Sequence, residues 1–116
     1  TTLRGDILRD YMSTAMLGAA VRLNDMVKMG GFHSYDEPLL EFLRHYRNAC
    51  AHGDRWHFTN KEPSNEARCR DVHIKRDMHD QRATWNTISP RLHVEFLDDI
   101  TNYFVPGLIP APRRAD

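Results

Sequence analysis

Cysteine is scarce in this chain of 116 residues, and the scarcity excludes whole classes of protein. Cys50 and Cys69 stand nineteen positions apart, form no CxxC pair and are too few for a disulfide scaffold. A zinc site that combined them with His57, His73 or His79 would lack the regular spacing of zinc ligands. We therefore expect free thiols and no metal, and keep zinc binding as a third alternative.

The chain also lacks a long hydrophobic run and any excess of charge. No stretch approaches the roughly 18–20 consecutive apolar residues that a membrane span requires. The N-terminus lacks the apolar block of a signal peptide. Sixteen basic and sixteen acidic side chains cancel, so the net charge predicts no attraction to nucleic acid. These absences favour a cytoplasmic protein that has no membrane partner.

Length and composition predict one small globular domain, because hydrophobic residues make up 41% and charged residues 28% of the chain. We expect this domain to cover residues 1–105. The proline-rich ending, 106–116, predicts an extended tail. A chain this short buries only a modest core, so dimerisation would be an expected supplement.

Residues 6–29 predict a long helix that Gly30-Gly31 terminates. The residues expected to face the core recur at helical spacing and share one stripe: Leu8, Met12, Ala15, Met16, Ala19, Leu23, Met26 and Val27. Further apolar residues lie on another side of the helix: Ile7, Tyr11, Gly18 and Val21. One neighbour within the chain does not need that much apolar surface, and a partner chain could cover the rest.

Two more helices are indicated by their capping residues. One begins near Asp36, an N-cap residue followed by Glu37-Pro38, and continues to Gly53. Its apolar arc consists of Leu39, Phe42, Leu43, Tyr46 and Cys50. The other helix covers 90–104 and begins with the N-cap and N1 pair Ser89-Pro90. Its apolar face consists of Leu92, Phe96, Leu97, Ile100, Tyr103 and Phe104, with His93 beside it.

Residues 53–88 are polar and show no sustained helical period. Two short alternating pieces, 55–59 and 70–74, predict a small β-hairpin. Trp56 lies in the first piece and could stack on an RNA base. An aromatic residue just after a helix end more often closes a small core, and we prefer that interpretation.

A row of polar residues runs along the second predicted helix, on the side roughly opposite its apolar arc. At 100° per residue, Glu41, His45, Asn48 and His52 fall within about 60° of each other. A polar outer face is ordinary for a surface helix, and Glu41 with His45 is an ordinary i, i+4 pair. Two imidazoles and an amide in a row, ending where the helix ends, also suggest a functional site.

The end of this helix resembles the signature of HEPN domains. Arg47-Asn48-Ala49-Cys50-Ala51-His52 fits the RN-x-x-x-H form of that signature. The continuation from Cys50 to Trp56 looks like the CAHxxRLW-type sequence of bacterial abortive-infection relatives. The match covers about ten residues, and outside it the resemblance is architectural. It implies a mainly α fold, an antiparallel helical bundle of HEPN type with a short polar loop or β-hairpin insertion, assembled as a dimer.

The resemblance also implies a function, namely a metal-independent endoribonuclease of toxin or antiphage type. Such enzymes cleave RNA by attack of the 2′-hydroxyl on the adjacent phosphate and need no cofactor. Carried over to this chain, His52 would be the general acid or base, Arg47 the phosphate clamp and Asn48 the orienting group. The implied partners are RNA, a second copy of the chain and, for a toxin, an antitoxin protein. Histidine and arginine suit this chemistry, since it moves two protons and gathers charge on phosphoryl oxygens.

Helix geometry adds a constraint. Arg47 and His52, five residues apart, point about 140° away from each other on a regular helix. Two chains related by a two-fold axis could pool these residues in a composite site. Second-rank candidates for binding RNA are Arg44, His45 and Arg55. Four further histidines have no support from the motif, and we leave them out of the site: His57, His73, His79 and His93.

The main alternative is a HEPN-like module without catalysis, which would dimerise or bind nucleotides or RNA. Zinc binding is the third alternative.

Overall fold

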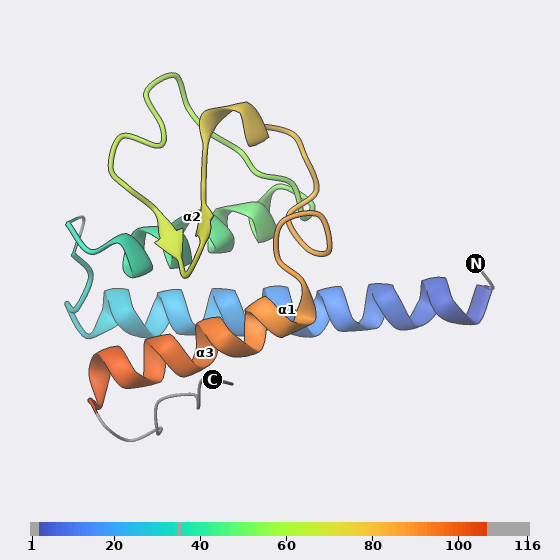
Figure 1. The fold of residues 1–116 in the computed structure, drawn as a ribbon, viewed down its shortest axis with the longest axis horizontal. Helices are drawn as coiled ribbons and strands as arrows, with labels where there is room; N and C mark the ends of the chain where they lie inside the picture. Colours follow the sequence, from blue (N-terminus) through green and yellow to red (C-terminus); the bar gives the residue numbers. More distant parts are fainter. Residues whose placement is uncertain (1–2, 35, 107–116) are drawn as a thin grey trace, which may run out of the picture.

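Over the residues that the structure describes, three α-helices and one small hairpin form the fold (Figure 1). The computed structural model describes residues 3–34 and 36–106, so the expected tail, 106–116, lies outside them apart from Pro106. The elements are α1 (Leu3–Met29), α2 (Pro38–Ala51), β1 (Arg68–Cys69), β2 (Val72–His73), the 3-10 helix η1 (Arg76–Met78) and α3 (Pro90–Phe104). The prediction of a mainly α fold is confirmed.

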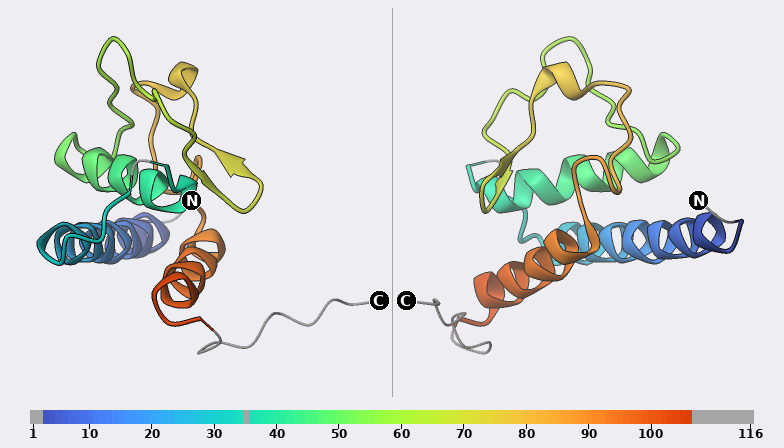
Figure 2. Two further views of the ribbon diagram at one scale, coloured as in Figure 1. Left: turned by 90° about the vertical axis from the view of Figure 1, so that its left-hand side faces the viewer. Right: turned by 45° about the vertical axis from the view of Figure 1, so that its right-hand side comes forward.

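The core lies where the three helices meet, with α2 running antiparallel to α1 and α3 (Figures 1 and 2). The rings of Phe42 on α2 and Phe96 on α3 are 5.4 Å apart. The Tyr46 hydroxyl lies 2.9 Å from Nδ1 of His93, a buried pair that joins the same two helices. The segment between α2 and α3 covers the opposite side of α2 (Figure 1). Because α2 is enclosed from both sides, it is the central element of the fold.

The capping residues explain where α2 and α3 begin. Ser89 accepts a hydrogen bond from the N–H of Leu92 at 3.1 Å, so the predicted start of α3 is confirmed. The predicted N-cap of α2, Asp36, is wrong by one residue. Glu37 takes that position and accepts from the N–H of Leu39 at 3.3 Å. Pro38 occupies the first helical position, where its missing N–H costs nothing, and this fixes the cap at Glu37.

The buried face of α1 is narrower and more polar than its sequence pattern predicted. It consists of Ser13, Met16, Ala20, Asn24 and Val27. Leu8 and Met26, assigned to the core from the sequence, are 57% and 53% exposed. The N-terminal turns of α1 project beyond the other helices, and Tyr11 there stays 74% exposed (Figure 1). Helical periodicity identifies an apolar side, but it does not tell how far the neighbouring elements extend along it.

The predicted pairing of residues 55–59 with 70–74 is wrong. The actual hairpin is local, with Cys69 opposite Val72 and Arg68 opposite His73. The piece that begins at residue 55 runs instead along 80–82, where the N–H of Trp56 donates to the Gln81 carbonyl at 3.0 Å. The turn of this hairpin, residues 70–71, lies inside the second predicted piece, so 70–74 is not a continuous strand that could pair with 55–59.

Trp56 itself is fully buried, and its indole N–H donates to Thr87 at 3.0 Å. The prediction that Trp56 belongs to the core is confirmed.

Candidate functional site

His52, the candidate proton-transfer residue, lies at the C-terminal end of α2, where the backbone has a defined geometry. The N–H of Asp54 donates to the Ala49 carbonyl at 2.8 Å, and the N–H of Gly53 donates to the Cys50 carbonyl at 3.3 Å. This is the Schellman arrangement, and Gly53 supplies the left-handed φ, +70°, that it requires. His52 is therefore the C-cap residue, and its side chain is exposed.

Arg47 and Asn48, the other two residues of the motif, lie near the C-terminal end of α2. Nε of Arg47 is 4.0 Å from Oδ1 of Asp25 on α1, and these side chains are 37% and 49% exposed. An exposed ion pair of this kind stabilises a protein by about 1 kcal/mol or less. A phosphate could therefore replace Asp25 at little cost. Asn48 is half-buried beside it.

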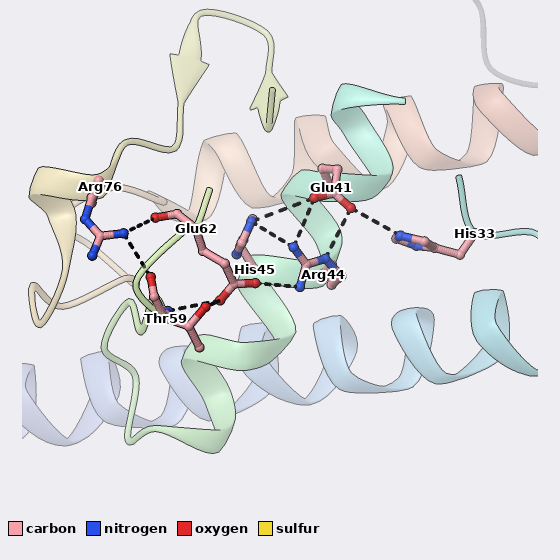
Figure 3. A network of polar contacts seen from close by, with 7 residues as sticks. All are labelled: His33, Glu41, Arg44, His45, Thr59, Glu62 and Arg76. Carbon is pink, nitrogen blue, oxygen red and sulfur yellow. Dashed lines mark hydrogen bonds and ion pairs between the residues drawn. The ribbon is translucent and has the colours of Figure 1, made fainter. Parts of the chain in front are cut away.

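Arg44, a second-rank candidate for binding RNA, is engaged within the protein (Figure 3). Its guanidinium donates to Glu41 at 3.2 and 3.1 Å and to Glu62 at 3.0 Å. Burial alone would lower the pKa of Arg44, but the hydrogen bonds to Glu41 and Glu62 outweigh it and raise the pKa. Burial raises the pKa of Glu62, but the hydrogen bonds from Thr59 and Arg44 outweigh that effect and lower it. Arg44 is thus charged and paired.

His45 is buried at 1% exposure, and Glu41 next to it at 0%. Both belong to the row of polar residues that the sequence placed on an outer face, so the expected exposure of that row is wrong at these two positions. Residues 59–76 pass over this side of α2 and supply Glu62 to the network (Figure 3). Burial and the charge of Arg44 lower the pKa of His45. His45 is therefore a neutral interior side chain that is too buried to contact RNA.

Arg55, the remaining second-rank candidate, is exposed. Its guanidinium donates to the Asp80 carbonyl at 2.7 Å, a neutral acceptor that leaves the positive charge uncompensated in this contact. Arg55 lines a cleft of about 380 Å³ between α1 and the turn after α2, together with Ser13, Asp54 and Arg82. Of the three second-rank residues, Arg55 is the one that a ligand can reach.

A polar cluster holds the turn after α2 in place. The carboxylate of Asp54 accepts from the N–H of Thr84 at 2.9 Å, from the Thr84 hydroxyl and from Nε of Arg82 at 3.1 Å. Ser13 on α1 hydrogen-bonds to the same threonine at 2.9 Å and to Arg82 at 3.1 Å. Nothing in the sequence groups these residues, because they come from three segments far apart in the chain. Their contacts fix the direction in which the chain leaves His52.

His57, which has no support from the motif, lies directly against His52. The two imidazole rings stack with their centroids 3.8 Å apart and their planes 11° from parallel. The ring of His79 is also close, with its centroid 5.3 Å from that of His57. The alternation of residues 55–58 could have placed His57 on the same side as Arg55. Nothing in the sequence could have placed it against the end of α2.

The zinc alternative finds no support in the described part of the chain. No three histidine, cysteine, aspartate or glutamate side chains gather there in a way that could hold a metal ion. Burial and the charge of Asp99 raise the pKa of the Cys69 thiol to about 12, which makes it a poor metal ligand.

The chain matches no protein-family model, no curated protein and no solved structure. Among the described residues, no helix is long and apolar enough to cross a membrane.

Proposed function

We propose that this chain is a metal-independent endoribonuclease of HEPN type that acts in the cytoplasm in a toxin or antiphage setting. The observation that carries the proposal is the separation of polar residues along α2. Glu41 and His45 lie inside the protein, whereas His52 is exposed at the C-terminal end. Arg47 is held by an exposed ion pair with Asp25 at 4.0 Å. The two residues that the chemistry needs most are thus the accessible ones.

Each residue has a role that its chemistry supports. The reaction removes a proton from the 2′-hydroxyl and returns one to the leaving 5′-oxygen, and an imidazole can perform either transfer near neutral pH. Negative charge develops on the phosphoryl oxygens, which the Arg47 guanidinium can bind through two hydrogen bonds. Asn48, half-buried next to Arg47, can orient the phosphate. This set of residues requires no metal or cofactor.

A homodimer is part of the proposal, and two features support it. The projecting end of α1 exposes Ile7, Leu8 and Tyr11, a patch suited to a second copy of the chain. Arg47 contacts α1, whereas His52 contacts His57, so the two motif side chains pack against different parts of the chain. A two-fold axis could bring Arg47 of one chain to His52 of the other. Sedimentation should give about twice 13.6 kDa, and a monomer would remove the composite site.

The decisive experiment incubates the purified chain with RNA in the presence of EDTA. We expect cleavage to survive chelation and the products to carry a 2′,3′-cyclic phosphate. Products with a 3′-hydroxyl would indicate metal-assisted hydrolysis instead. RNA binding without cleavage would favour the non-catalytic module.

Two variants, each with a matched control, test the catalytic roles of His52 and Arg47. His52→Ala should lose about 100-fold or more in the rate of cleavage, and so should Arg47→Ala, because each removes a group that acts in the transition state. The matched controls, His73→Ala and Arg91→Ala, change exposed residues on β2 and α3, outside the motif, and should stay active. Asn48→Ala should lose less. Full activity of His52→Ala would overturn the assignment.

A further inference from the structure

The stacked pair formed by His52 and His57 is a feature that the motif does not contain. A centroid distance of 3.8 Å and an interplanar angle of 11° describe rings in direct face-to-face contact. His52 comes from the end of α2 and is exposed, while His57 comes from the next segment and is half-buried. Both rings therefore border the same surface of the molecule.

The position of His57 is fixed by its neighbours. Trp56 and Phe58 on either side are buried, which turns the intervening side chain outward. The backbone of Trp56 is held at both ends, since its N–H donates to Gln81 and its carbonyl accepts from the N–H of Asp80 at 2.8 Å. A side chain that points outward from a segment anchored in this way has a fixed position, as a catalytic residue requires.

His79 is a second aromatic neighbour of His57. Its Nδ1 accepts a hydrogen bond from the N–H of Phe58 at 3.0 Å, which assigns the acceptor role to that nitrogen. With its ring centroid 5.3 Å from that of His57, this imidazole limits the freedom of His57 to turn away from His52. Contacts with both His52 and His79 thus restrict the His57 ring.

The stack places two imidazoles side by side at one surface of the molecule. An imidazole can either accept a proton or donate one, so two of them can supply both a base and an acid. Cleavage by the 2′-hydroxyl needs both, because an unassisted leaving oxygen would depart as an alkoxide.

We propose that His57 is the second proton-transfer residue of this site and acts together with His52 of the same chain. The inference rests on the proposed ribonuclease function and extends it. One imidazole removes the proton of the 2′-hydroxyl as the bond from O2′ to phosphorus forms. The other gives its proton to O5′ as the bond from phosphorus to O5′ breaks. The products are a 2′,3′-cyclic phosphate and a 5′-hydroxyl, with no change of oxidation state.

The test compares His52→Gln and His57→Gln with the control His73→Gln, all on RNA in EDTA. We expect each of the first two variants to lose about 100-fold or more in rate, because each removes one proton transfer. The control should keep the activity of the unchanged chain. Circular dichroism and urea unfolding check the fold, and His57→Asn provides a smaller side chain if His57→Gln fails to fold.

A second substrate separates catalysis from support of the fold. In an RNA whose 5′-leaving oxygen is replaced by sulfur, the leaving group departs as a thiolate and needs no acid. The variant that lacks the general acid should regain most of its rate on this substrate, and the variant that lacks the base should not. Rescue of exactly one of the two histidine variants is the expected result, and no rescue of either would overturn the pairing.

Failure of this inference differs from failure of the proposed function. Cleavage that depends on His52 but is as fast in His57→Gln as in His73→Gln would overturn the role of His57 alone. Absence of cleavage by the unchanged chain would overturn both.

Discussion

Removal of Arg44 should destabilise this protein far more than removal of a surface arginine that makes equally many contacts. Arg44 donates three hydrogen bonds to carboxylates, two to Glu41 and one to Glu62, at 3.0–3.2 Å. The Glu41 side chain is 0% exposed, and that of Arg44 is 19% exposed. The variant Arg44→Met keeps much of the apolar stem and deletes the charge. It leaves the Glu41 carboxylate inside the protein with its contact to His33 at 3.2 Å.

The size of the effect follows from burial. Removing one partner of a buried ion pair costs about 3–5 kcal/mol, because the remaining charge stays out of water without compensation. A domain of this size has about 5–15 kcal/mol of stability in total, so the loss is a large share of it. With a slope of about 2 kcal/mol per molar urea, the unfolding midpoint should fall by roughly 1.5–2.5 M.

Arg70 is the matched control. It also makes three hydrogen bonds to carboxylates, at 2.7 Å to Glu95 and twice at 3.0 Å to Asp99. These three side chains are about 30% exposed, so water can replace the guanidinium once it is removed. Arg70→Met should therefore cost about 1 kcal/mol or less.

Urea unfolding followed by circular dichroism measures both variants under one set of conditions. The double variant Glu41→Gln/Arg44→Met should recover part of the loss, because a neutral amide is cheaper to bury than an unpaired carboxylate. Equal losses for Arg44→Met and Arg70→Met would refute the reasoning, since they would mean that burial does not distinguish the two clusters.

Three further predictions concern stability. Burial lowers the pKa of both His45 and His93, so below about pH 6.5 the unfolded chain takes up protons that the folded chain resists. Stability should be level between about pH 7 and 8 and fall toward pH 5.5 by up to about 1.4 kcal/mol per pH unit for each histidine, and a rise in acid would contradict this. Trp56→Ala should cost about 3–5 kcal/mol in urea unfolding because the side chain is fully buried, whereas the loss of an RNA-stacking residue would leave stability unchanged. Gly53→Ala should cost about 1 kcal/mol from its φ of +70° alone, since a Cβ there meets no atom of the described residues within 4 Å, and a much larger loss would point to a contact that this geometry lacks.

The sequence by itself determined the helices and much of the core. Ser89-Pro90 fixed the start of α3, because a hydroxyl cap and a proline at the first helical position act locally. The glycines after residue 29 marked the end of α1 for the same local reason. The sequence also indicated that Trp56 belongs to the core. The exposed position of His52 follows from the end of α2 at Ala51, which the sequence placed two residues further on, at Gly53.

Tertiary structure alone decided which polar residues of α2 are buried and which histidines meet. A helical wheel separates apolar from polar faces, and it assigns Glu41 and His45 to water. Both are buried here because Glu62, eighteen residues beyond Arg44, completes a set of charges that compensates them. The contact of His52 with His57 depends likewise on the turn that Asp54 and Thr84 hold together. Such arrangements rest on contacts between distant segments, and periodicity along one helix carries no information about its partners.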